Sequence, residues 1–85
     1  MAKKKNRVFK LTAPDAKKVS LAGSFSDWKK VAMEAGAKGV WRIQVALEPG
    51  EHEYRFFVDG HWQDDPTCQE HRSNDFGTQN CIKRV

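Results

Sequence analysis

Hydrophobic and polar residues alternate along much of this chain, and the alternation is clearest over residues 40–47. In that segment every second residue is large and apolar: Trp41, Ile43, Val45 and Leu47. Successive side chains of a β-strand point to opposite faces, so a period of two predicts a strand with one buried face. We therefore place Trp41 in the core.

Shorter segments with the same pattern predict further strands over residues 7–12, 18–22, 30–33, 52–58, 61–62 and 79–85. Turn-forming residues separate these segments, most clearly at Pro49-Gly50 and Asp59-Gly60. No window shows the 3.6-residue apolar period of a helix, and the polar residues 64–78 are expected to form a long surface loop. Six or seven short strands joined by turns predict one antiparallel β-sandwich domain.

Basic charge is concentrated at the N-terminus. The net charge is +4, but residues 1–10 carry five basic side chains and no acid, whereas the other 75 residues carry ten basic and eleven acidic ones. We therefore expect a flexible basic arm over residues 1–6 and a near-neutral domain over residues 7–85. Nucleic-acid-binding domains more often spread basic charge over one face, so the arm favours a solvated terminus over a nucleic-acid site.

The chain shows no signal for export or membrane insertion. No stretch approaches the ~20 apolar residues that span a bilayer, and no apolar region follows the basic N-terminus. We expect a cytoplasmic protein without a membrane partner. A disulfide between Cys68 and Cys81 is possible in principle, but without an export signal we favour two reduced thiols. A metal site would need more ligands at closer spacing than these cysteines and His71 offer, so we expect neither a metal nor a cofactor.

Residues for catalysis are not recognisable in the pattern. Asp64 and Asp65 are adjacent, and neighbouring side chains point apart, whereas glycoside hydrolysis needs two carboxyls facing each other across a bond. The three histidines share no metal-binding spacing, and no glycine-rich segment precedes a helix. The sequence therefore predicts a domain that is not an enzyme.

Trp28 and Trp62 lie outside the apolar alternation, flanked by turn formers and charges. An exposed indole is suited to stack on a flat ligand such as a sugar ring. A two-residue turn at Asp59-Gly60 would pair Phe57 with Trp62 and place Arg55 on the same face. Arg55 and Trp62 then form either a saccharide site, with the guanidinium donating to hydroxyls, or a surface cation–π pair, and the pairing leaves both open.

Three ordered motifs add a family resemblance over about residues 7–85. They are KVSLAGSFSDW at residues 18–28, PGEHEYRFFVDGHW at 49–62 followed by Asp65-Pro66, and FGTQNCI at 76–82. Together they resemble the glycogen-binding domain of the AMP-activated protein kinase β subunit, in carbohydrate-binding module family 48, which includes N-terminal domains of isoamylases and glycogen branching enzymes. The resemblance implies an immunoglobulin-like, early-set β-sandwich of six to eight short strands. It also implies non-catalytic binding of an α-1,4-glucan such as glycogen, starch or a maltooligosaccharide.

The family's glucan-binding positions match a set of residues that the resemblance implies as the site: Trp28, Arg55, Trp62, Phe76, Thr78 and Asn80. The two tryptophans match the family's stacking residues. Arg55 replaces a lysine, which keeps the charge and donors but changes their geometry. Phe76 replaces a leucine that reaches into the glucan, and an aromatic ring there could stack on the sugar or close the site.

Two other classes of function stay open at this point. A protein-interaction or regulatory domain could keep the sandwich and lose the sugar, because a fold alone does not fix function. Nucleic-acid binding through the arm and exposed aromatics would show steep salt dependence. The joint presence of Trp28, Arg55, Trp62 and Asn80 favours glucan binding. The protein partner that the resemblance implies is a glycogen-metabolising enzyme or a signalling protein.

Overall fold

The computed structural model describes residues 4–74 and 77–85, and in these residues the chain is built from strands. The nine strands are β1 (Lys5–Thr12), β2 (Val19–Gly23), β3 (Val31–Ala32), β4 (Glu34–Ala35), β5 (Val40–Leu47), β6 (Glu51–Val58), β7 (His61–Gln63), β8 (His71–Ser73) and β9 (Gln79–Arg84). Two short 3-10 segments, η1 (Ser24–Ser26) and η2 (Ala37–Gly39), lie between strands. Among the described residues, no helix is long and apolar enough to cross a membrane.

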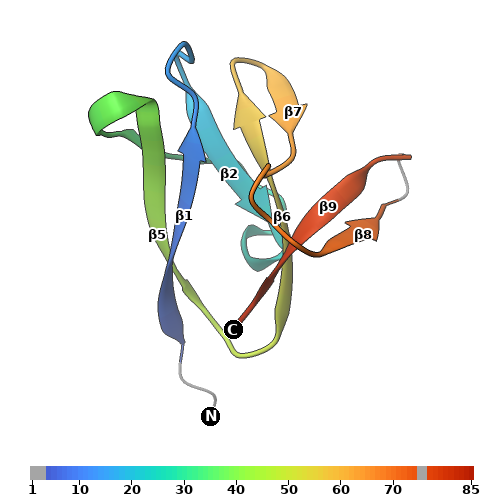
Figure 1. Ribbon diagram of the computed structural model, residues 1–85. Coiled ribbons are helices and arrows are strands. Elements are labelled where there is room, and N and C mark those ends of the chain that lie inside the picture. Colours follow the sequence, from blue (N-terminus) through green and yellow to red (C-terminus); the bar gives the residue numbers. More distant parts are fainter. Residues whose placement is uncertain (1–3, 75–76) are drawn as a thin grey trace.

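The strands form two antiparallel sheets packed as a sandwich, which confirms the predicted fold (Figure 1). One sheet has the strand order β1-β5-β4. The other has the order β3-β2-β6-β9-β8, and β7 pairs with β6 beside this path. In Figure 1 the β1-β5 pair lies on the left, and β6, β9 and β8 lie to its right.

The described residues form nine strands, more than the predicted six to eight, because two segments fold differently from what their sequence pattern predicts. The single strand expected over residues 30–33 is divided: β3 pairs with β2, whereas β4 pairs with β5 of the other sheet. Met33 lies buried between them, so the chain crosses from one sheet to the other at this residue. The segment expected to be a surface loop contains β8, which pairs with β9.

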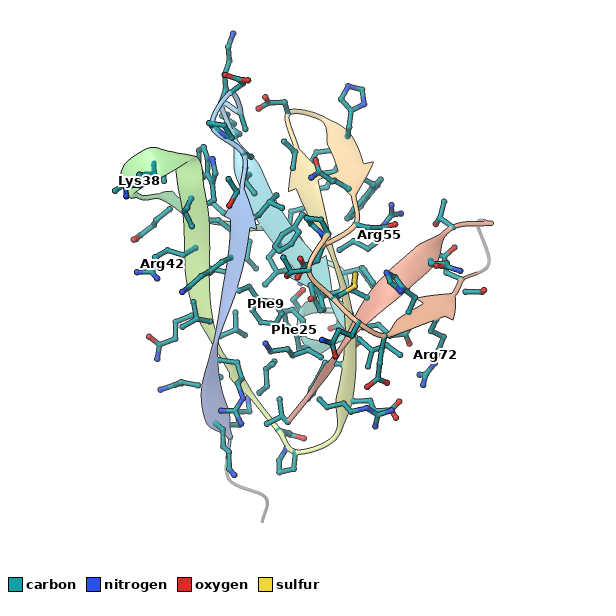
Figure 2. All side chains as sticks on the ribbon, in the orientation of Figure 1. Phe9, Phe25, Lys38, Arg42, Arg55 and Arg72 are labelled. Atoms are coloured by element: carbon teal, nitrogen blue, oxygen red, sulfur yellow. A yellow bond between two sulfur atoms is a disulfide. The ribbon has the colours of Figure 1, made fainter. Side chains whose placement is uncertain are left out.

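The core lies between the sheets, and the alternating faces supply it as predicted. Phe9 and Leu11 of β1 are paired with Ile43 and Trp41 of β5, and all four contribute to the core or pack against it. Trp41 is half-buried, and its Nε1 donates a 3.0 Å hydrogen bond to the carbonyl of Ala13. Figure 2 shows Phe9 and Phe25 between the sheets, whereas Arg55 and Arg72 lie toward the β6-β9-β8 side.

Cys68 and Cys81 form a disulfide, so the prediction of two reduced thiols is wrong for this structure. Their Cα atoms lie 6.1 Å apart, because the segment after β7 folds back against β9. A separation of 13 residues in the sequence cannot reveal this tertiary contact. At the other end of the chain, β1 begins at Lys5, so Lys5 and Asn6 pair with β5 although the arm was predicted to include them.

Candidate functional site

The β6–β7 hairpin has the register that the sequence predicted. Asp59 and Gly60 have φ values of 48° and 89°, the left-handed conformations that a two-residue turn of this type requires. Phe57 consequently pairs with Trp62. Their ring centroids are 5.0 Å apart in an edge-on arrangement, and Trp62 keeps 43% of its surface exposed. The hairpin therefore presents two adjacent aromatic rings on the outer face of the larger sheet.

The side chain of Asp59 ties this hairpin to the segment before β2. Its carboxylate accepts hydrogen bonds from the backbone N–H groups of Lys17 and Lys18, at 2.7–3.1 Å. These N–H groups lower the pKa of the Asp59 carboxyl, because they stabilise its charged form. The turn is thus held by a carboxylate as well as by backbone geometry.

Arg55 lies beside Trp62, as the strand pairing predicted, with its guanidinium carbon 6.0 Å from the indole centroid. Its Nε donates a 3.0 Å hydrogen bond to Asp64 Oδ1, and its Nη1 donates a 3.3 Å hydrogen bond to Thr78 Oγ1. The Arg55 side chain is 15% exposed, so these bonds hold a largely covered guanidinium in one orientation. The structure thereby joins three of the predicted site residues: Arg55, Trp62 and Thr78.

Asn80 sits beneath this group and is only 6% exposed. Its carbonyl oxygen accepts a 3.1 Å hydrogen bond from Asn74 Nδ2, and its own Nδ2 donates to Glu53 Oε1 at 3.3 Å. Asn74 also bonds the hydroxyl and the backbone N–H of Thr78. In this structure the Asn80 amide therefore supports the β8–β9 connection that presents Thr78. Phe76, the remaining predicted site residue of this connection, lies outside the described residues.

Trp28 lies on the loop between η1 and β3 and is 39% exposed. Its φ is 61°, and its backbone N–H donates to the carbonyl of Gly23 at 2.9 Å. The same loop carries Lys30, whose Nζ lies 4.0 Å from the Phe57 ring centroid and 5.6 Å from that of Trp62. Lys30 thus links the loop of Trp28 to the aromatic pair on the hairpin.

Sequence reasoning missed three residues that the structure places next to Arg55 and Trp62: Lys30, Phe57 and Asp64. The alternation did place Phe57 on the outer face, and this was the available signal. For Asp64 the signal was the hairpin register, which continues from Phe57 and Trp62 to Arg55 and Asp64. For Lys30 the chain offered only a charge in a turn-rich segment. The proximity of Lys30 to the site arises from long-range packing, which no local pattern encodes.

A second group of side chains gathers around the disulfide. One ligand atom each from Cys68, His71 and Cys81 lies within 4.8 Å of the others, and His71 Nε2 is 3.2 Å from Cys68 Sγ. A cysteine binds a metal ion through its thiolate sulfur. Because the two sulfurs are bonded to each other, the group as it stands offers one imidazole and no thiolate.

Exposed ion pairs border the site along β6, β8 and β9. Arg72 lies 2.6 Å from Glu51 and 3.7 Å from Glu53, and Arg84 bridges Glu51 and Glu70. The hydrogen bond from Arg72 lowers the pKa of the Glu51 carboxyl, with further lowering by the charge of Arg84. Such exposed pairs contribute little to stability individually, so we assign them no role in binding.

Comparison with known proteins gives a consistent result. The family model described as the glycogen recognition site of AMP-activated protein kinase matches residues 6–85. The chain is 38% identical over 78 residues to 5'-AMP-activated protein kinase subunit beta-1 of Rattus norvegicus and of Homo sapiens, covering 92% of this chain and 28% of each subunit. It is also 40% identical over 52 residues to Protein FLOURY ENDOSPERM 6, chloroplastic, of Oryza sativa subsp. japonica, covering 60% of this chain and 10% of that protein. The chain thus spans little more than a quarter of the kinase subunits it matches.

Proposed function

This chain belongs to the family of glycogen recognition domains of AMP-activated protein kinase, and on that premise we propose that it is a non-catalytic module that binds α-1,4-glucans. Glycogen, starch chains and maltooligosaccharides are the ligands of this class. The observation that carries the proposal is the pairing of an exposed Trp62 with Arg55 on one outer face. An indole can stack on the C–H face of a glucose ring while the adjacent guanidinium donates to its hydroxyls.

The hydrogen bonds of Arg55 support this proposal over a surface cation–π pair. Asp64 and Thr78 take two of its donors and orient the group, and the guanidinium has five N–H donors in total. Donors therefore remain for a ligand without loss of the bonds that hold the side chain. A rigid donor beside a stacking platform reduces the entropy lost on binding.

We also propose that Trp28 supplies the second stacking ring. Support comes from Lys30 on the same loop, which contacts the Phe57 and Trp62 rings and so keeps this loop next to the hairpin. Two stacking rings and a few exposed hydrogen bonds contribute about 1 kcal/mol each. The expected dissociation constant for one site is therefore roughly micromolar to millimolar. A polymer presents many copies of the ligand, so binding to glycogen should be tighter than binding to a short chain.

Isothermal titration of the 85-residue chain with β-cyclodextrin and with maltoheptaose tests the proposal. We expect saturable binding of both, and no binding of cellohexaose, whose β-1,4 linkages give a different chain curvature. A chain that is folded by circular dichroism and binds neither α-glucan would overturn the proposal and favour a sandwich retained for protein interaction.

For the protein that carries this module, we propose a glycogen-metabolising enzyme or a signalling protein as the partner. The match to a subunit of a protein kinase supports this proposal. Recovery of such a partner on immobilised glycogen, and its loss when β-cyclodextrin is added, is the expected result. Partner recovery that β-cyclodextrin leaves unchanged would contradict a glucan-dependent role.

A further inference from the structure

A groove of about 580 Å³ opens beside the aromatic pair on the outer face of the larger sheet. Its lining comprises three lysines, Lys17, Lys18 and Lys30, together with Ser20, Phe57 and the turn at Asp59. The volume lies within the range of about 300–1,000 Å³ that is usual for small-molecule sites. The groove joins the segment before β2, the loop before β3 and the β6–β7 hairpin.

The charge of this groove differs from that of the rest of the domain. The 75 residues after the basic N-terminal segment carry ten basic and eleven acidic side chains, yet three of those ten line this one groove. Its single acidic residue, Asp59, directs its carboxylate at the backbone N–H groups of Lys17 and Lys18. The lining therefore includes three basic residues and one acidic residue, and the backbone N–H groups of the chain already hydrogen-bond that carboxylate.

The groove is also continuous with the proposed sugar-stacking ring. Phe57 lines the groove and contacts Trp62 with a centroid distance of 5.0 Å. Lys30 lines it too, and its ammonium lies 5.6 Å from the Trp62 ring. An anionic substituent on a glucose ring stacked at Trp62, or on the next ring, would therefore lie near Lys30, and Lys17 and Lys18 line the same groove.

We propose that this groove binds the phosphate of a phosphorylated α-glucan whose glucose rings occupy the Trp62 platform. The assignment rests on the proposed glucan-binding function. A phosphomonoester carries a charge of about −1.5 to −2 at pH 7 and three acceptor oxygens, which suits ammonium groups and the Ser20 hydroxyl. A polar sugar with an apolar ring face suits a lining that combines Phe57 with charged donors. An acidic peptide would supply the charge but would have no use for the adjoining indole.

The test compares maltoheptaose with maltoheptaose that carries one glucose 6-phosphate, each titrated into the 85-residue chain. We expect the phosphorylated chain to bind roughly three- to tenfold more tightly, the gain typical of a few exposed ion pairs. That preference should shrink as sodium chloride is raised, because exposed charges are screened. Equal affinity for the two oligosaccharides would overturn the proposal while leaving the glucan module intact. Failure of neutral maltoheptaose to bind would instead overturn the proposed function.

Matched variants test whether the preference for the phosphorylated oligosaccharide arises in this groove. Lys17→Gln/Lys18→Gln keeps the backbone N–H groups that Asp59 uses, so the turn should survive. It should abolish most of the preference for phosphate and leave the affinity for neutral maltoheptaose unchanged, which also reports that the domain is folded. The control Lys5→Gln/Lys10→Gln removes two exposed lysines from β1 of the other sheet and should keep the preference. A preference that survives the first variant, or disappears in the control, would overturn the assignment.

Competition experiments distinguish a phosphorylated glucan from free phosphate and from an acidic peptide as the ligand of the groove. Inorganic phosphate should compete with the phosphorylated oligosaccharide only weakly, because it gains nothing from Trp62. Equal competition by inorganic phosphate would show that the groove recognises free phosphate and would overturn the proposal. Displacement by poly-glutamate at a comparable concentration would identify an acidic peptide as the occupant and would also overturn it.

Discussion

The hydroxyl of Tyr54 donates a 2.6 Å hydrogen bond to the carboxylate of Asp65 inside the sandwich. Arg55, which follows Tyr54, and Asp64, which precedes Asp65, make the corresponding contact on the outer face, where Arg55 donates to Asp64 at 3.0 Å. Two neighbouring pairs thus join β6 to the segment after β7 from both sides of the sheet. Adjacent side chains point to opposite faces, so one pair stabilises the fold while the other orients a proposed ligand-binding group.

Tyr54→Phe should destabilise the domain by about 1–3 kcal/mol, because it leaves the buried Asp65 carboxylate without its hydroxyl donor. Asp65 is 8% exposed, so water cannot readily replace that donor. The aromatic contact of residue 54 with Phe9 should be retained. Urea unfolding measures the effect, and an unchanged midpoint would contradict it.

Asp64→Asn should leave stability nearly unchanged and weaken maltoheptaose binding severalfold. The carboxylate is 46% exposed, and exposed ion pairs contribute about 0–1 kcal/mol to stability. The amide oxygen of asparagine nevertheless accepts the hydrogen bond of Arg55 more weakly than a carboxylate does, so Arg55 is held less firmly and loses more entropy on binding. The matched control is Glu70→Gln, which removes the charge of a similarly exposed carboxylate and weakens its bonds to Arg84. Equal effects of the two variants on affinity would argue against an orienting role for Asp64.

Trp62→Ala and Trp28→Ala should each weaken β-cyclodextrin binding by about 1–3 kcal/mol, the usual loss of one stacking platform. Both side chains are substantially exposed, so the thermal midpoint should change little. Val8→Ala is the control, since Val8 is an exposed hydrophobic residue on β1 of the other sheet. Unaltered binding in the Trp28→Ala/Trp62→Ala double variant would rule out these residues as the site.

Reduction of the Cys68–Cys81 disulfide should lower the free energy of unfolding by about 3 kcal/mol, the value expected for a loop of this length. The two residues are 13 apart, and the bond closes a loop that contains the whole of β8 and joins its start to β9. Urea unfolding with and without dithiothreitol measures the difference. Cys68→Ala should unfold identically in both conditions, and a reduced wild-type chain with an unchanged midpoint would contradict the prediction.

Asp59 should make stability depend on pH. Its lowered pKa means that the folded state holds the proton less tightly than the unfolded chain, where the carboxyl titrates near about 3.9. The stabilisation that the ionised Asp59 carboxylate provides is therefore fully present at pH values above its pKa in the unfolded chain. It is lost as the pH falls through its lower pKa in the folded state. Asp59→Asn, which tolerates the left-handed conformation of the turn, should lower the melting temperature at pH 7. The difference in melting temperature between the variant and the wild type should narrow below pH 4. A difference that stays constant with pH would refute a stabilising role for the ionised Asp59 carboxylate.

The sequence by itself determined the local features of this protein. A period of two fixed which faces of β5 and β6 are buried, because the pleat sends alternate side chains to opposite sides. The Asp59-Gly60 turn fixed the pairing of Phe57 with Trp62, because a two-residue loop allows one register. Together, the alternation and the turn determine that Arg55 and Trp62 are neighbours on the outer face.

Tertiary structure alone decided which distant segments meet. It placed Cys68 on Cys81 and enclosed Asn80 between Asn74 and Glu53. It also assigned β3 and β4, on either side of Met33, to different sheets. It brought Lys17, Lys18 and Lys30 to the lining of one groove. These contacts join residues that are far apart in the chain or lie in irregular segments. No periodic pattern records them, because they depend on how two complete sheets pack and where the connections between strands fold back.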